Sequence, residues 1–239
     1  MPPKVSVLIH LEELRRRIIF VLLAYFVSVV ISYFFVDEIL HFLQQPIGKL
    51  IYITPLELFI TRIKLALFMG LLASFPFIMV QLRFYLLPAL DKISARLFDL
   101  FLLFSIALFY SGIMIAYKLF LPAVLRILLM FQTENLKAMI TVGRYVSFVS
   151  VFLLCFGLLS LVPVAVLFLT RSGLVKLEFL KSQRKYIWLI SFIIAAVLSP
   201  PDVVTQILVA VPLGCLFEFS ILISSISGYN KKQEQGGIK

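Results

Sequence analysis

Charged residues are scarce in this 239-residue chain: Asp, Glu, Lys and Arg make up 14% of it, whereas hydrophobic residues make up 62%. Soluble globular chains are about 25% charged and about 45–50% apolar. So few polar side chains cannot cover a water-facing surface, and lipid must therefore cover part of the molecule. The composition excludes an ordinary soluble domain and indicates an integral membrane protein.

Side chains that commonly carry catalysis or bind metals are also few, with two cysteines and two histidines in the whole chain. Cys155 and Cys215 lie inside apolar runs without a CxxC spacing, and His10 and His41 lie outside these runs. A disulfide framework or a zinc site needs such residues in clusters. The GxSxG, HExxH and Walker-loop strings do not occur either. The sequence therefore predicts a protein that is not an enzyme and that uses no metal or cofactor.

Long apolar segments are what the sequence has in abundance. A bilayer core about 30 Å thick needs about 20 apolar residues in a helix. Five segments meet or approach this length, and a shorter one ends at a double proline. The six predicted spans are residues 18–35, 65–84, 97–121, 146–169, 187–199 and 203–226. We therefore expect an all-α membrane protein with a single transmembrane domain over residues 1–226 and a mobile cytoplasmic tail over residues 227–239.

The distribution of basic residues predicts how these spans are oriented. An even number of spans places both termini on one side, together with the loops at residues 83–96 and 170–185. That side holds 15 of the 22 Lys and Arg residues. Because basic residues accumulate on the cytoplasmic side, we expect both termini to be cytoplasmic. The net charge of +10 thus reflects topology, and nucleic acid is not an expected partner.

The connections on the other side differ in length. Residues 36–63 and 122–145 keep apolar residues at helical spacing, which predicts short interfacial helices. The third connection is only Pro200-Pro201-Asp202, so the fifth and sixth spans should form a tight hairpin of two short helices. Such a pair is mismatched to an ordinary bilayer and should thin it locally.

One carboxylate lies deep within a predicted span. Glu218 is about seven residues from the end of the last span, or about 10 Å deep at 1.5 Å per residue. A charge at such a depth normally faces protein or a wet cavity. It either locks two helices together or belongs to a polar groove for a substrate or a partner helix. Gln206 lies on roughly the same face of that helix and extends the polar stripe, which favours the groove.

A charged string precedes the first span. Glu12 and Glu13 are followed by Arg15, Arg16 and Arg17. The simplest interpretation is that the arginines set the orientation and pair with the carboxylates at i+3 or i+4. The alternative is that an exposed carboxylate beside the membrane accepts guanidinium groups from a ligand, with Asp91 of the next cytoplasmic loop contributing.

Several strings taken together, in order over about residues 8–225, resemble TatC, the multispanning subunit of the twin-arginine protein translocase. The similarity is carried by His10-Leu11-x-Glu13-Leu14-Arg15-x-Arg17, Pro55-x-Glu57-x-Phe59, Pro76, Gln81, Tyr85-Leu86-x-Pro88-x-Leu90, Gly112, Pro122, Phe156-Gly157, Pro163, Arg184-x-Tyr186, Ser199-Pro200-Pro201-Asp202-x-x-Thr205-Gln206, Pro212-Leu213 and Leu216-Phe217-Glu218.

The resemblance implies a fold, a role and partners. It implies six helices in a concave, glove-like bundle in the cytoplasmic (inner) membrane. It also implies that the chain binds the twin-arginine signal peptides of folded proteins and organises TatA- and TatB-type single-span subunits in a multimeric complex. Export in that family is driven by the proton-motive force, without a nucleotide.

The resemblance also implies roles for individual residues. Glu13 would receive the signal-peptide arginines, with Arg17, Tyr85 and Pro88 around the same site. Gln206 and Glu218 would contact partner helices, and a periplasmic motif comprises Pro55, Glu57, Pro200, Pro201 and Asp202.

The chain departs from the family pattern at two places. Ser94 stands where the family usually has a second cytoplasmic Glu, for which Asp91 could substitute. Leu161 stands where many members have Glu or Gln.

Two other hypotheses remain beside a translocase receptor. The first is a small-solute or proton-coupled transporter that uses Gln206 and Glu218. An intramembrane carboxylate favours it, whereas the lack of an evident internal repeat opposes it. The second is a purely structural assembly subunit, which would bind partner helices but no signal peptide.

Overall fold

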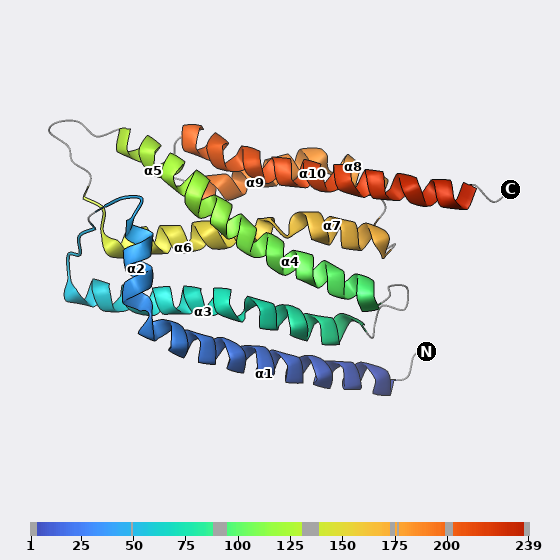
Figure 1. The fold of residues 1–239 in the computed structure, drawn as a ribbon, viewed down its shortest axis with the longest axis horizontal. Helices are drawn as coiled ribbons and strands as arrows, with labels where there is room; N and C mark the ends of the chain where they lie inside the picture. The colour runs from blue at the N-terminus through green and yellow to red at the C-terminus, as the bar shows by residue number, and fades with distance from the viewer. Residues whose placement is uncertain are drawn as a thin grey trace. The chain divides into compact units, whose positions relative to one another are not determined.

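The computed structural model describes residues 4–48, 50–87, 95–130, 139–172, 175, 177–198 and 203–236, and most of these residues are helical (Figure 1). The predicted all-α fold is confirmed. In chain order the helices are α1 (Lys4–Phe34), α2 (Val36–Gln44), α3 (Pro55–Leu86), α4 (Ala95–Ile115), the π-helical turn η2 (Ala116–Phe120), α5 (Leu121–Met130), α6 (Val142–Leu159), α7 (Val162–Arg171), α8 (Leu177–Ser182), α9 (Arg184–Leu198) and α10 (Val203–Gly236).

Among the described residues, five helical stretches are long and apolar enough to cross a membrane. They are Leu11–Phe34, Pro55–Leu86, Ala95–Ile127, Val142–Arg171 and Val203–Ser225, and each contains one of the five longer predicted spans almost entirely. The remaining predicted span coincides with α9, which has 15 residues and is about 22 Å long at 1.5 Å per residue. The six-span count therefore stays a prediction.

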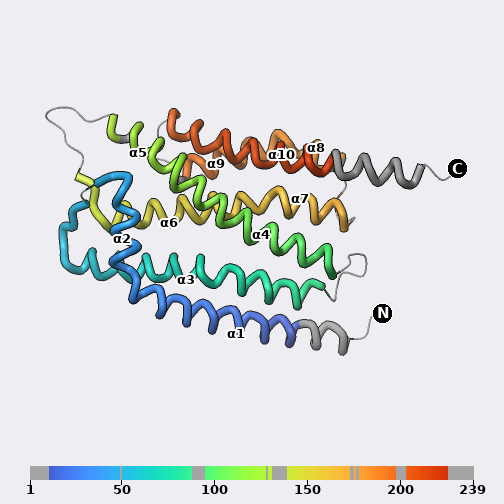
Figure 2. The backbone as a smooth tube through the Cα atoms, viewed as in Figure 1, coloured from blue at the N-terminus to red at the C-terminus, as the bar shows by residue number. Residues whose placement is uncertain are grey.

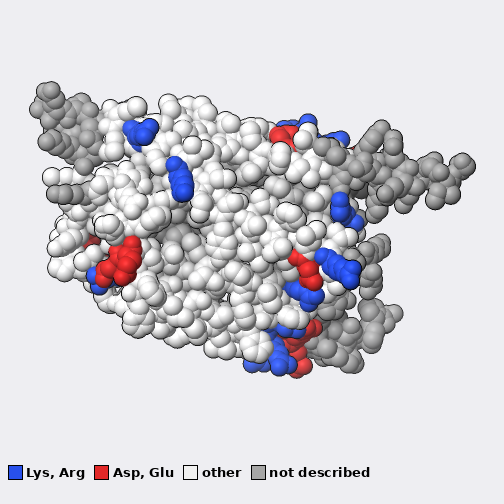
Figure 3. Space-filling model, in the orientation of Figure 1, with Lys and Arg blue, Asp and Glu red and all other residues white. Residues whose placement is uncertain are grey.

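Large apolar side chains are exposed along these helices. Phe26, Phe34 and Val197 are each more than 60% exposed. Figure 3 shows the same property as wide areas of one face that carry no charged side chain. An exposed apolar surface of this extent is covered by another apolar phase in a stable protein. Here that phase is lipid, in agreement with the composition.

The chain divides into two compact units. One comprises Met1–Ile106 with Met139–Ser150, and the other comprises Ala107–Ala138 with Val151–Lys239. The divisions fall within α4 and α6, so each of these helices contributes to both units. We describe each unit by itself.

In the first unit, α1 runs alongside α3 (blue and teal in Figure 1). Tyr25 of α1 donates a hydrogen bond to the carbonyl oxygen of Leu67 at 3.3 Å. Short helix α2 lies within the predicted connection at residues 36–63 and contacts α3 through an ion pair between Asp37 and Arg62 at 2.7 Å. The Tyr145 hydroxyl of α6 donates to the Leu43 carbonyl at 2.6 Å and holds the end of α2.

In the second unit, α10 packs against α7, α8 and α9 (Figure 2). Phe217 and Ile221 of α10 form a buried cluster with Val166 of α7. The hydroxyls of Thr170 and Ser224 lie 2.8 Å apart and join the same two helices. This packing places one face of α10 in the protein interior, whereas Phe219 and Leu222 on another face are exposed.

Two of the predicted spans are not continuous α-helices. The third passes through the π-helical turn η2 just before Pro122, which has no N–H to donate to the carbonyl of Lys118. The fourth breaks at Ser160 and Leu161, between α6 and α7, and Pro163 is the second residue of α7. Proline removes a helical hydrogen bond and its ring clashes with the carbonyl four residues earlier, which explains both interruptions.

The last helix is longer than its predicted span. Whereas the span was expected to end at residue 226, α10 continues to Gly236. A helix of 34 residues is longer than a bilayer core requires, so its C-terminal part extends beyond the apolar segment.

Candidate functional site

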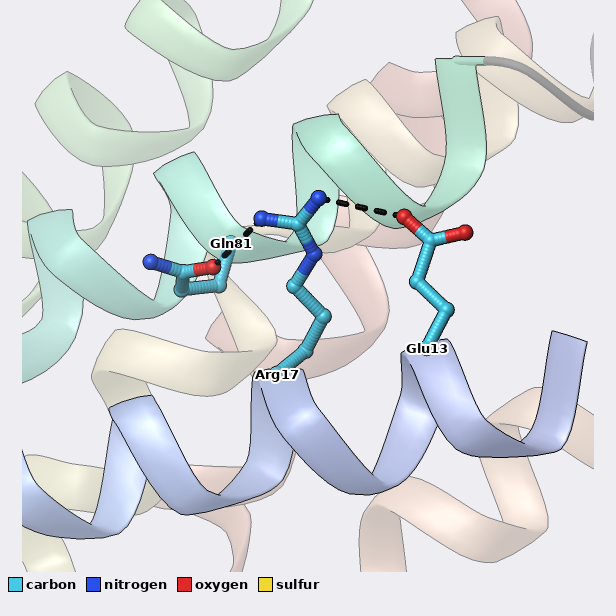
Figure 4. Close-up of polar contacts among 3 residues, drawn as sticks. All are labelled: Glu13, Arg17 and Gln81. Atoms are coloured by element: carbon cyan, nitrogen blue, oxygen red, sulfur yellow. Dashed lines mark hydrogen bonds and ion pairs between the residues drawn. The ribbon is translucent and has the colours of Figure 1, made fainter. Parts of the chain in front are cut away.

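A charged cluster joins the first helix to the end of α3. Arg17 of α1 pairs with Glu13 one turn earlier, with Nη2 3.1 Å from Oε1 of the carboxylate. Its other terminal nitrogen, Nη1, donates to Oε1 of Gln81 at 3.2 Å (Figure 4). The predicted i,i+4 pairing within the charged string is thus confirmed for these two residues. The contact with Gln81, 64 residues later, was not predicted.

The Arg17 guanidinium is held on more than one side. Its Cζ atom lies 5.0 Å from the centre of the Phe84 ring, which is a cation–π distance. Its Nε is buried and has no hydrogen-bond partner among the described residues. The contacts of Arg17 with Gln81 and Phe84 of α3 therefore hold its guanidinium beside Glu13.

Glu13 remains accessible in spite of this pair. Its side chain is 34% exposed, and only one of its two oxygens accepts a hydrogen bond from the described residues. It lines an open depression of about 470 Å³ together with Glu12, Arg16, Arg17 and Phe20. A carboxylate has about four lone-pair sites, so Glu13 can accept a second guanidinium while it keeps Arg17.

The structure places only part of the remaining predicted signal-peptide site. Tyr85 lies in the last turn of α3, one turn beyond Gln81, and is partly buried. Pro88, Asp91 and Ser94 lie outside the described residues. Whether Asp91 substitutes for a second glutamate at Ser94 stays a prediction.

A second ion pair lies near the same end of α3. Arg83 binds both oxygens of Asp99 at the start of α4, with Nη2 3.1 Å from Oδ2 and Nε bonded to Oδ1. The guanidinium also lies over the Phe84 ring at 5.6 Å. The sequence did not predict this pair, because a loop separates the two residues.

Glu57 has a clear structural function at the other end of α3. Its Oε2 accepts from the backbone N–H of Ile53 at 3.0 Å, and its Oε1 accepts from the N–H of Gly143 at 3.1 Å. Thr54 caps the same helix by accepting from the Glu57 N–H, and Pro55 occupies the first helical position, where no donor is needed. Glu57 therefore ties the start of α3 to the start of α6.

A short backbone pairing supports that junction. Ile51 forms an isolated parallel bridge with Thr141, in which the Val142 N–H donates to the Ile51 carbonyl at 2.9 Å. Of the predicted periplasmic motif, Pro55 and Glu57 belong to this junction. Pro200, Pro201 and Asp202 lie outside the described residues.

Gln206 and Glu218 of α10 both contact α9. The Gln206 amide donates to the Phe192 carbonyl at 3.2 Å, and Glu218 pairs with Arg184 at 3.2 Å. Both contacts hold α9 to α10, which fits the interpretation of Glu218 as a lock between helices. The Glu218 side chain is still 35% exposed, so this pair does not exclude contact with another helix.

Comparison with known proteins gives a consistent result. The family described as Sec-independent protein translocase protein (TatC) matches residues 9–212. A TatC protein of Carboxydothermus hydrogenoformans is 37% identical over 90% of both chains. Another, of Aquifex aeolicus, is 35% identical over 95% of this chain and 97% of its own length. The Escherichia coli TatC protein is 32% identical over 90% of this chain and 86% of its own.

Solved structures agree with the sequence comparison. A crystal structure of the twin-arginine translocase receptor TatC superposes with a TM-score of 0.83 at 34% identity, and the match covers 90% of this chain and 99% of that one. The family is a component of a protein translocase and is not a family of enzymes. The chain, a helical membrane protein with five long apolar helices, belongs to the TatC family of Sec-independent protein translocase proteins.

Proposed function

We propose that this chain is the core receptor subunit of a twin-arginine translocase, and that it recognises the paired arginines of signal peptides at Glu13. The observation that carries the proposal is the geometry of the Glu13 carboxylate. It accepts a guanidinium from Arg17 on one oxygen and borders an open depression. Glu13 thus already binds a guanidinium group, which is the group that a signal-peptide arginine would bring.

Arginine, rather than positive charge in general, fits this site. A guanidinium presents five N–H donors in a planar fork, whereas a lysine ammonium is a compact point charge. The Phe20 ring lies in the same depression, and the Arg16 guanidinium is already 5.7 Å from its centre. A second planar cation could therefore combine a carboxylate contact with stacking on an aromatic ring.

The wider role follows from family membership together with the distribution of charge. We infer that the chain lies in the cytoplasmic membrane with both termini in the cytoplasm, because 15 of 22 basic residues lie on that side of the predicted topology. It organises TatA- and TatB-type single-span subunits, with Gln206 and Glu218 near the contact. The proton-motive force drives export of folded cargo by the complete assembly.

Site-specific photo-crosslinking tests the receptor role. A photoreactive residue replaces Phe20, which lines the depression but supplies no charge, and a signal peptide carries either Arg-Arg or Lys-Lys. We expect a crosslink with the Arg-Arg peptide that weakens strongly with Lys-Lys. The same photoreactive residue at Phe42 of α2, which is also exposed, is the control and should give no crosslink. Equal crosslinking of both peptides at Phe20 would show that the site does not distinguish arginine from lysine.

A further inference from the structure

A second open depression, of about 390 Å³, lies in the C-terminal unit among α8, α9 and α10. Its charged lining comprises Lys181 at the end of α8, Arg184 at the start of α9, and Glu218 of α10. Its apolar lining includes Phe219 and Leu222, which are 57% and 55% exposed. This groove thus places two cations beside two uncovered apolar side chains.

The groove carries a net positive charge. Glu218 neutralises one cation through its pair with Arg184, but that pair uses only one of the five guanidinium donors. Lys181 is exposed and forms no ion pair with any residue that the structure describes. The segment of residues 170–185 adds to the charge, because besides Lys181 and Arg184 it contains three further Lys or Arg residues and a single acidic residue, Glu178. An anion in the groove would therefore contact free N–H donors in a region of positive potential.

The apolar flank identifies the kind of anion. Phe219 and Leu222 belong to the part of α10 that is apolar enough to cross a membrane, so their exposed faces meet acyl chains. Lys181 and Arg184 lie where the apolar part of α9 begins. A ligand that fills the whole groove must carry an anionic group at one end and hydrocarbon at the other, and a phospholipid, with its phosphate and acyl chains, meets both requirements. Basic pockets at helix ends bind lipid head groups in this way.

We propose that this groove is a binding site for an anionic phospholipid, whose phosphate contacts Lys181 and Arg184 and whose acyl chains lie along Phe219 and Leu222. The Arg184–Glu218 pair fixes the guanidinium at the rim of the groove. A bound lipid would also cover the outer side of the α9–α10 contact. The site is separate from the Glu13 cluster and does not depend on signal-peptide binding.

The single tryptophan of the chain allows a direct test. Trp188 lies one helical turn after Arg184 in α9, and its ring packs against Gly214 of α10. The full-length protein is reconstituted in phosphatidylcholine vesicles that contain a minor fraction of lipid with brominated acyl chains, which quench tryptophan fluorescence at short range. The brominated lipid is either phosphatidylglycerol or phosphatidylcholine. One net positive charge predicts about fivefold enrichment of phosphatidylglycerol at Trp188.

Matched variants separate the groove from general surface charge. Lys181→Gln should abolish the preference for phosphatidylglycerol, and Lys181→Arg should retain it. Arg96→Gln removes the same charge from an exposed position on the same predicted membrane side but outside the groove, and it should leave the preference unchanged. Circular dichroism checks that each variant is folded, and the comparison of the two lipids on wild-type protein needs no variant at all.

Three outcomes would overturn the proposal. Equal quenching by both brominated lipids in the wild type would mean that the groove does not select an anionic head group. If Arg96→Gln weakened the preference for phosphatidylglycerol as much as Lys181→Gln, the preference would arise from the charge of the whole surface and not from the groove. Loss of the preference in sodium phosphate, but not in sodium chloride of equal ionic strength, would mean that the groove selects free phosphate rather than lipid.

Discussion

Gly70 of α3 lies directly against Val29 of α1. A Cβ atom built on Gly70 would be 2.5 Å from Cγ2 of Val29 and 2.8 Å from both its Cα and its backbone nitrogen. Two of these three atoms belong to the backbone and cannot rotate away. The close contact of α1 with α3 therefore depends on glycine at this position, and the contact between Arg17 and Gln81 depends on the same pair of helices.

Gly70→Ala should separate the two helices and destabilise the protein. Overpacking of this kind costs about 1–3 kcal/mol, which exceeds the gain in helix propensity of about 1 kcal/mol from replacing glycine. The measurement is the free energy of unfolding in detergent. In a Val29→Ala background the loss of stability caused by Gly70→Ala should be smaller but should not vanish, because the backbone atoms of residue 29 remain. A Gly70→Ala variant that is as stable as wild type would contradict the predicted close approach.

Glu57→Gln should loosen the junction between α3 and α6. The carboxylate accepts from two backbone N–H groups, whereas an amide offers one oxygen and turns an NH₂ group toward the other donor. We expect faster hydrogen–deuterium exchange at the amides of Ile53 and Gly143, together with a lower melting temperature. Glu38→Gln, at an exposed carboxylate of α2, is the control and should change neither. Unchanged protection at Gly143 would mean that Glu57 does not hold this junction.

Glu218→Ala should distinguish a lock between helices from a partner contact. Its partner Arg184 is 49% exposed at the start of α9 and can turn to water when Glu218 is removed, and alanine avoids the cost of placing a carboxylate within a span. We therefore expect an unfolding free energy within about 1 kcal/mol of wild type but markedly less co-purification of a TatB-type subunit. Glu178→Ala, at an exposed carboxylate of α8, should affect neither measurement. A large loss of stability with normal co-purification would assign Glu218 a purely structural role.

Local patterns predicted much of this molecule correctly. The apolar segments marked the five long helices, because burial in lipid requires about 20 apolar residues regardless of tertiary contacts. The pairing of Glu13 with Arg17 was also predictable, since it follows from helical spacing alone. Features that depend on a single helix, or on a helix and the lipid around it, can therefore be predicted from the sequence.

Contacts between segments that are distant in the sequence could not be predicted from local patterns. Nothing near Glu57 in the sequence indicates that its carboxylate binds the backbone of Gly143, and nothing near Gln206 indicates the Phe192 carbonyl. The partnership of Arg17 with Gln81 requires α1 and α3 to be adjacent first. Pro122 and Pro163 are visible in the sequence, but whether each gives a π-turn or a break depends on how neighbouring helices pack.

The most direct test of the central claim measures how Glu13 affects the preference for arginine over lysine. Binding of signal peptides with Arg-Arg or Lys-Lys is measured on purified wild-type protein and on Glu13→Gln, with Glu38→Gln as the control. Loss of a charge-assisted hydrogen bond corresponds to about tenfold in affinity. We predict that wild type and Glu38→Gln bind Arg-Arg about tenfold more tightly than Lys-Lys, and that folded Glu13→Gln binds both equally weakly. A Glu13→Gln variant that keeps the full preference for Arg-Arg would contradict the assignment of Glu13 as the arginine receptor.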